Sequence, residues 1–184
     1  MADASVSPSP DHLPLAPAVR TAFDVAVWLL DRARTDDMHL PLQKLQRLLF
    51  IAQAAYVDGL LMPAVFVAED LGPVEPNLQR LMSDGRPEDL PAEALPRQVE
   101  TFLDETWRRF AHMSTERLNG LVAKNAAYAA ALAAGRGCLV AQDALAGTFA
   151  AGAAKIAEDV RMLRSQNGAP VAVRAWRPGE RIGG

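Results

Sequence analysis

The sequence predicts a mainly α-helical protein: a compact multi-helix globular domain around a central buried helix, with a short extended or β segment near residues 64–74. Three observations lead to this prediction. Half of the 184 residues are apolar and 22% are charged, the balance of a folded globular chain. Residues 42–56 carry apolar side chains at helical spacing. The β-favouring run Val-Phe-Val at 65–67 is followed by the turn-forming pair Gly72-Pro73.

The chain is expected to form one domain with an irregular segment at each end. Residues 1–18 contain four prolines and few core-forming side chains, which predicts a flexible Pro-rich extension. They lack the basic start and apolar run of a secretory signal, so we expect a cytoplasmic protein. Residues 19–165 should form the helical domain, and residues 166–184 either a C-terminal tail or an edge strand.

Composition argues against two classes of partner. The net charge of -3 argues against nucleic acid, because phosphate backbones recruit clustered Lys and Arg. Only the tail around Trp176, with three arginines, could attract an acidic partner or nucleic acid, and an inert tail is the alternative. No apolar stretch reaches the roughly 20 residues that span a bilayer, so a membrane partner is not expected.

Two helices are predicted at the start of the domain. Pro17 can occupy the first helical position, and apolar residues then recur at helical spacing from Val19 to Leu30. This helix should end within residues 34–41, because Pro41 disfavours helix just before it and can open the next one.

The second helix is expected to be the centre of the fold. At about 100° per residue, one face collects the apolar residues Leu42, Leu45, Leu48, Leu49, Ala52, Ala55 and Tyr56. From Leu48 onward Phe50 and Ile51 make the opposite face apolar too, so other helices should enclose this half up to a stop near Asp58-Gly59. The first half keeps a polar patch of Gln43, Lys44 and Arg47, either a solvated face or a docking surface.

The next segments alternate between extended chain and helix. A short strand or extended leg at 65–67 and a rigid turn at Gly72-Pro73 should precede a helix from about Asn77. Residues 83–96 hold too many prolines and charges for a regular element and predict a surface loop. A helix should follow Pro96, with the buried residues Val99, Phe102, Leu103, Thr106 and Phe110.

The second half is predicted to stay helical. Ser114 is a candidate N-cap, with Glu116 in the first turn behind it. The alanine-rich run at 125–134 should form a helix that Gly135 ends, and a further helical pattern extends from about Val140 to Arg164. Beyond it, weak alternation at 171–175 leaves the edge strand and the loose tail as alternatives.

Two sequence blocks carry a resemblance to a known family. The stretch "LPLQKLQRLLFIAQAAYVDG" (40–59), followed by "FVAEDLGPVEPNLQRL" (66–81), resembles the signature of the Panacea domain, the family of the SocA-type antitoxins and their prophage-associated relatives. Residues 102–149 are similar to the second half of that domain, where the family usually has a Trp at what looks like the place of Tyr128. The resemblance implies a small helical antitoxin that neutralises a toxin encoded by a neighbouring gene, by direct binding or by delivering it to a protease.

The leading hypothesis is therefore a non-enzymatic protein-binding module. Its candidate protein-binding residues are Gln43, Lys44, Arg47, Glu69, Asp70, Gly72, Pro73, Glu75 and Tyr128. A prophage or mobile-element adaptor or structural protein with the same fold and no toxin is the second hypothesis. Surplus apolar faces in the alanine-rich half are compatible with a homodimer, or they complete the monomer core.

An unrecognised enzyme is the third hypothesis, and the sequence supports it least. No phosphate loop, metalloprotease helix or nucleophile elbow is present, so catalytic, cofactor-binding and metal-binding residues are all predicted to be none. His39 and His112 fall near expected helix ends, where solvated or capping histidines are common. The single cysteine, Cys138, is interpreted as a small core residue, and a lone cysteine agrees with a reducing compartment.

Overall fold

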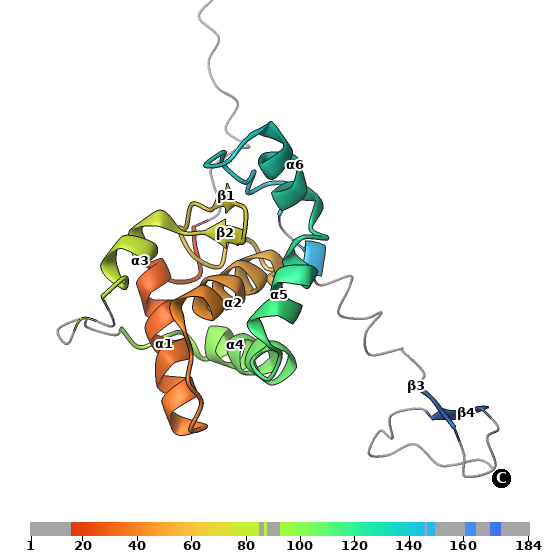
Figure 1. Ribbon diagram of the computed structural model, residues 1–184. Coiled ribbons are helices and arrows are strands. Elements are labelled where there is room, and N and C mark those ends of the chain that lie inside the picture. The colour runs from red at the N-terminus through yellow and green to blue at the C-terminus, as the bar shows by residue number, and fades with distance from the viewer. Residues whose placement is uncertain are drawn as a thin grey trace, which may run out of the picture.

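The structure is a computed structural model that describes residues 16–84, 87, 93–145, 147–149, 161–164 and 170–173. The mainly helical class is confirmed, with a small antiparallel hairpin on the helices (Figure 1). In chain order the described elements are α1 (Ala22–Thr35), α2 (Leu42–Ala55), β1 (Val67–Glu69), β2 (Gly72–Val74), α3 (Pro76–Leu81), α4 (Arg97–Phe110), α5 (Thr115–Val122), α6 (Ala126–Ala134), β3 (Arg161–Arg164) and β4 (Pro170–Val173). None of the helices within these ranges is both long and apolar enough to cross a membrane.

Helix α2 is the centre of the fold, as its periodicity predicts. It crosses the middle of the molecule, with α1, α4 and α5 around it and the β1–β2 hairpin above (Figure 1). Every residue from Lys44 to Ala54 is buried. The Phe50 ring packs edge-to-face against Phe66, with centroids 5.2 Å apart, and against Tyr128 at 6.4 Å. The apolar back of α2 thus joins the hairpin and α6 to the helical core.

Helix α1 begins later than predicted, at Ala22 and not at Pro17. Thr21 and Asp24 form a capping box, in which the Asp24 N–H donates to the Thr21 hydroxyl at 3.2 Å and the Asp24 carboxylate accepts the Thr21 N–H at 3.0 Å. This box satisfies the first free N–H groups of the helix and fixes its start. The chain before it is not helical, because the Ala18 N–H donates to the Leu60 carbonyl at 2.8 Å.

The hairpin differs from the predicted turn in one respect. Strands β1 and β2 are antiparallel, with Val67 opposite Val74 and Glu69 opposite Gly72. Gly72 and Pro73 therefore belong to β2, and the chain reverses at Asp70-Leu71. The prediction of a rigid turn at Gly72-Pro73 was wrong because it treated both residues as turn formers. Both instead pair with β1, and the Arg47 side chain packs against them.

The later helices follow the predicted pattern. Val99, Leu103 and Phe110 of α4 are buried, while Phe102 is half-buried. The Ser114 hydroxyl caps α5 by accepting the Arg117 N–H at 3.2 Å. Helix α6 ends at Gly135 as predicted, with a φ of 140° there. The predicted loop at 83–96 and extension at 1–18 lie partly or mostly outside the described residues.

The predicted helix from Val140 to Arg164 was wrong at Val140 and at residues 161–164, whereas residues 148 and 149 are helical. Residues 138–140 pair with β1, since the Ala68 N–H donates to the Cys138 carbonyl at 2.9 Å and the Val140 N–H to the Phe66 carbonyl at 2.8 Å. Residues 161–164 form β3, which pairs with β4 so that Arg161 lies opposite Val173. Backbone pairing overrides the helical pattern in both places.

One polar cluster connects α1 to α4. The Trp107 indole N–H donates to the Asp36 carboxylate at 2.7 Å, and Arg32 forms an ion pair with Asp36 at 3.2 Å. Arg32 also pairs with Asp104 on α4. The Trp107 hydrogen bond, helped by Arg32, lowers the pKa of Asp36 below its ordinary value of 3.8.

This lowered pKa predicts acid sensitivity. Because the folded-state pKa of Asp36 lies below the unfolded one, its stabilising contribution is complete well above pH 3.8 and is lost as pH falls through the folded-state pKa. Urea unfolding at a series of pH values should therefore show a flatter acid limb for Asp36→Asn than for the wild type. Asp84→Asn removes an exposed carboxylate and should keep the wild-type profile; parallel profiles for all three proteins would contradict the assignment.

Candidate functional site

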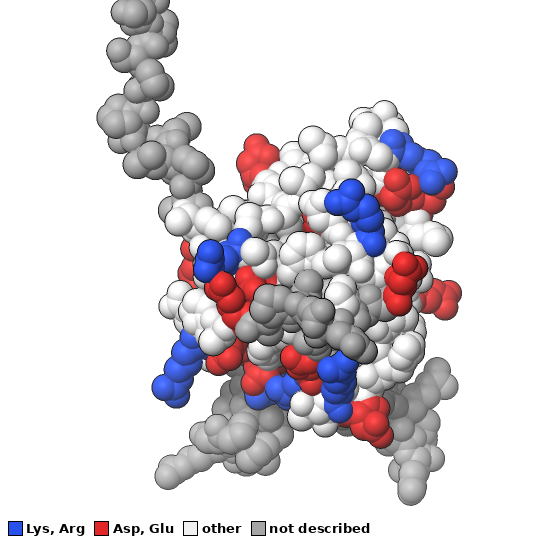
Figure 2. Space-filling view, turned by 90° about the vertical axis from the view of Figure 1, so that its left-hand side faces the viewer, with Lys and Arg blue, Asp and Glu red and all other residues white. Residues whose placement is uncertain are grey.

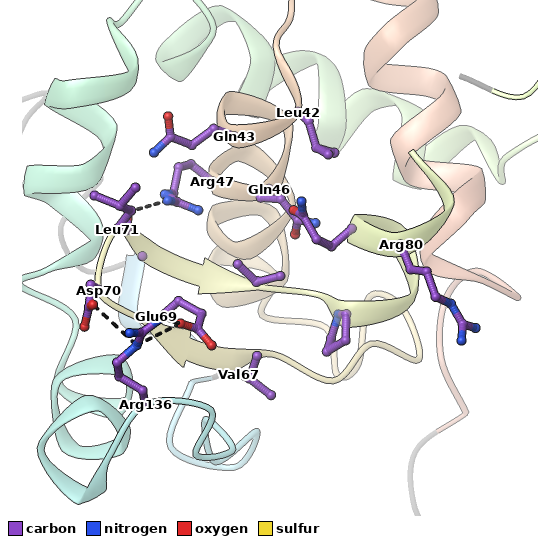
Figure 3. Close-up of a pocket in the computed structure, with 14 residues that line it drawn as sticks. Leu42, Gln43, Gln46, Arg47, Val67, Glu69, Asp70, Leu71, Arg80 and Arg136 are labelled. Carbon is purple, nitrogen blue, oxygen red and sulfur yellow. Dashed lines mark hydrogen bonds and ion pairs between the residues drawn. The ribbon is translucent and has the colours of Figure 1, made fainter. Parts of the chain in front are cut away.

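The hairpin is held to α2 by a buried arginine. Only 2% of Arg47 is exposed. Its guanidinium donates to the Pro73 carbonyl at 2.9 Å, to the Leu71 carbonyl, and to the Asn119 side-chain oxygen on α5 at 2.7 Å. Figure 3 shows the side chain reaching from α2 toward the hairpin. One cation therefore joins three elements.

The neighbouring amide extends this attachment along the strand. Gln46 accepts the Glu75 N–H at 2.9 Å and donates to the Glu75 carbonyl at 3.2 Å. A single side chain thus makes both hydrogen bonds that a paired strand would make. Together Gln46 and Arg47 occupy the outer edge of β2, which would otherwise present unpaired backbone groups. Gln46 was missed from the sequence, although an uncharged amide inside a buried helical run is a recognisable signal.

The outer edge of β1 is closed as well, by residues 137–140. Tyr128 supports this side, since its hydroxyl donates to the Glu69 carbonyl at 2.6 Å. Arg136 forms ion pairs with the carboxylates of Glu69, at 2.9 Å, and Asp70, at 3.3 Å. The hairpin is consequently fixed on both edges, and its Asp70-Leu71 tip projects between them.

Burial also sets the electrostatics of the site. Desolvation lowers the pKa of the Arg47 guanidinium and of the Lys44 ammonium, and it raises the pKa of the Tyr128 hydroxyl. In the described part of the chain, the acceptors around Arg47 are neutral oxygens and none is a carboxylate. The charge of Arg47 is thus held by hydrogen bonds alone.

A groove lies between the first half of α2, the hairpin and the start of α3. Its volume is about 750 Å³. The lining residues are Leu42, Gln43, Gln46, Arg47, Val67, Glu69, Asp70, Leu71, Gly72, Val74, Pro76, Gln79, Arg80 and Arg136. The lining is largely aliphatic and amide, and its charged groups lie toward the two ends (Figure 3).

The nine predicted residues divide between this groove and its supports. The groove contains Gln43, Arg47, Glu69, Asp70 and Gly72. Lys44, Pro73, Glu75 and Tyr128 are buried and do not line it. The expectation that the first turns of α2 leave Lys44 and Arg47 accessible was wrong, because both side chains are buried. The hairpin and α5 pack against Arg47. The sequence prediction left out Arg80 and Arg136, which lie at opposite ends of the groove, and did not single out Leu71 within the hairpin.

Among the residues that the structure describes, metal-ligating side chains show no comparable convergence. Within the residues that the structure describes, no group of three or more His, Cys, Asp or Glu side chains could hold a metal ion. Cys138 is half-buried in the segment that pairs with β1. On the side shown in Figure 2, Lys and Arg are interspersed with Asp and Glu and form no continuous basic surface.

No protein-family model, curated protein or solved structure matches the chain. The resemblance to the Panacea domain stays a prediction.

Replacing Arg47 should destabilise the protein, because this side chain attaches the hairpin to α2 and α5. Arg47→Met removes the donors from two backbone carbonyls and from Asn119, and unsatisfied buried acceptors predict a loss of roughly 3 kcal/mol in the free energy of unfolding. Arg117→Met, at an exposed position, should change it by less than about 0.5 kcal/mol. Urea unfolding followed by circular dichroism measures both. Equal midpoints for the two variants would refute the anchoring role.

Gly72 should be required for the same reason. Its φ of +125° disfavours other residues, and a Cβ there would lie 2.6 Å from Arg47 Cζ. Gly72→Ala should therefore lower the free energy of unfolding by more than about 1 kcal/mol. Gly120 lies within α5 with open space around it, so Gly120→Ala should raise stability by roughly 0.5 kcal/mol. Thermal unfolding tests both signs; a neutral Gly72→Ala would show that the guanidinium can move aside.

Proposed function

We propose that this chain is a non-enzymatic protein-binding module whose contact surface is the groove between α2 and the hairpin. The observation that carries the proposal is the exposed hairpin tip. Leu71 is 68% exposed, yet its carbonyl accepts a hydrogen bond from buried Arg47. An apolar residue whose backbone is fixed beside a groove loses less conformational entropy on binding than one in a mobile loop.

The chemistry of the groove favours binding over catalysis. Its two carboxylates, Glu69 and Asp70, are engaged by Arg136 and lie on the hairpin beside each other in sequence. Neither is placed as an isolated acid or base against a nucleophile. Besides the arginines, the polar lining consists of glutamine amides: Gln46 is engaged by Glu75, while the exposed amides of Gln43 and Gln79 suit hydrogen bonding to a peptide backbone.

The partner class in this proposal is a toxin encoded by a neighbouring gene, as the motif resemblance implies. Neutralisation is either by direct binding or by delivery of the toxin to a protease. An adaptor or structural protein from a prophage or mobile element, with the same surface and no toxin, is the alternative. Growth arrest when the neighbouring gene is expressed alone, relieved by co-expression of this chain, favours the antitoxin.

The contact surface is tested by co-purifying this chain with the product of the adjacent gene. Leu71→Ser should weaken the complex about tenfold or more, the factor that corresponds to 1.4 kcal/mol. Val57 is equally exposed, at 68%, but does not line the groove, so Val57→Ser should leave the affinity unchanged. Leu71 is the better site for this test than Arg47, whose replacement disrupts the fold.

Two results would contradict the proposal. A complex that survives Leu71→Ser at full affinity removes the groove from the contact surface. A neighbouring product that neither binds nor arrests growth removes the antitoxin assignment.

A further inference from the structure

The groove carries an excess of positive charge. Three arginines and two carboxylates line it, which leaves one positive charge on a chain whose net charge is -3. Arg136 already pairs with both carboxylates. Arg80 is exposed at the end of α3 and has no ion pair in the described part of the chain. Arg47 lies beneath, with neutral acceptors only.

The hairpin edges limit how an occupant can bind. Gln46 and Arg47 cover the edge of β2, and residues 137–140 cover the edge of β1. A partner therefore cannot bind by adding a strand to this hairpin. It has to lie across the hairpin face, where Val67 and Val74 are opposite each other and half-buried.

That face has an aliphatic centre and charged groups at both ends. Leu42 and Leu71 extend the apolar surface from Val67 and Val74. Figure 3 shows Arg80 on α3 at one end and the Arg136 ion pairs at the opposite end. In an extended chain every second side chain faces the same surface, so aliphatic residues two positions apart can pack on this centre while a residue at one end of the segment reaches Arg80.

We propose that the groove recognises an extended segment of the partner protein in which aliphatic side chains at alternate positions are flanked at one end by an acidic residue. The aliphatic side chains pack on Val67, Val74 and Leu71, and a carboxylate pairs with Arg80. The buried charge of Arg47 strengthens the attraction, because it is poorly screened by solvent. This inference rests on the proposed function and specifies the chemistry of the partner at the same groove.

The test uses two synthetic peptides that carry leucine at alternate positions with serine between, one with aspartate and the other with lysine at the same end. Titration of the full chain, followed by amide NMR shifts, should show binding of the aspartate peptide, with the largest changes at Gln43, Leu71 and Arg80. Arg80→Glu should weaken this binding about tenfold, as expected for loss of a charged contact worth 1.4 kcal/mol. Arg97→Glu reverses an exposed arginine outside the groove and should leave the affinity unchanged.

Several outcomes would overturn the inference: no binding of the aspartate peptide, equal binding of the lysine peptide, or an Arg80→Glu affinity equal to that of the wild type. The result is separable from the proposed function. If Leu71→Ser disrupts the partner complex but the aspartate peptide does not bind, the acidic segment is wrong and the protein-binding groove stands. If the peptide binds but no neighbouring product does, the groove chemistry stands and the toxin partner is wrong.

Discussion

The burial of one guanidinium is the constraint on which the site depends. Arg47 is taken out of water into the centre of the molecule, and removing a cation from water is costly unless its donors find acceptors. Those acceptors come from the hairpin and from α5, so the three elements have to meet at one point. Arg47 thereby helps to set the position of the hairpin, together with Gln46 on the same edge and residues 137–140 on the other, and so the shape of the groove.

The two sequence blocks that seem unrelated, Gln46-Arg47 and residues 71–75, are halves of one arrangement. Side chains of α2 take the place of a third strand along β2. Glycine at position 72 leaves room for the guanidinium. Proline at position 73 has no N–H, so its carbonyl is its one polar backbone group. Arg47 donates a hydrogen bond to this carbonyl. The chain covers its own sheet edge without a further strand.

Periodicity predicted much of the fold but less of the site. The apolar faces of α2 and α4 determine their burial, and the caps at Ser114 and Gly135 follow from local chemistry. Periodicity assigns a polar residue to one face of a helix, but it does not show whether a hydrogen-bond acceptor from a distant segment packs against that face. Arg47 was therefore expected in solvent. The extended segment after Gly137 was missed for the same reason, since its partner, β1, is about seventy residues earlier.

The anchoring bonds reach only the main chain of the hairpin. Arg47 contacts the carbonyls of Leu71 and Pro73, and Gln46 contacts the peptide groups of Glu75, so the side chain at position 71 contributes to none of them. Mutations at the tip can accordingly accumulate without a penalty to the scaffold. A chain built in this way can vary its exposed tip while its framework stays constant.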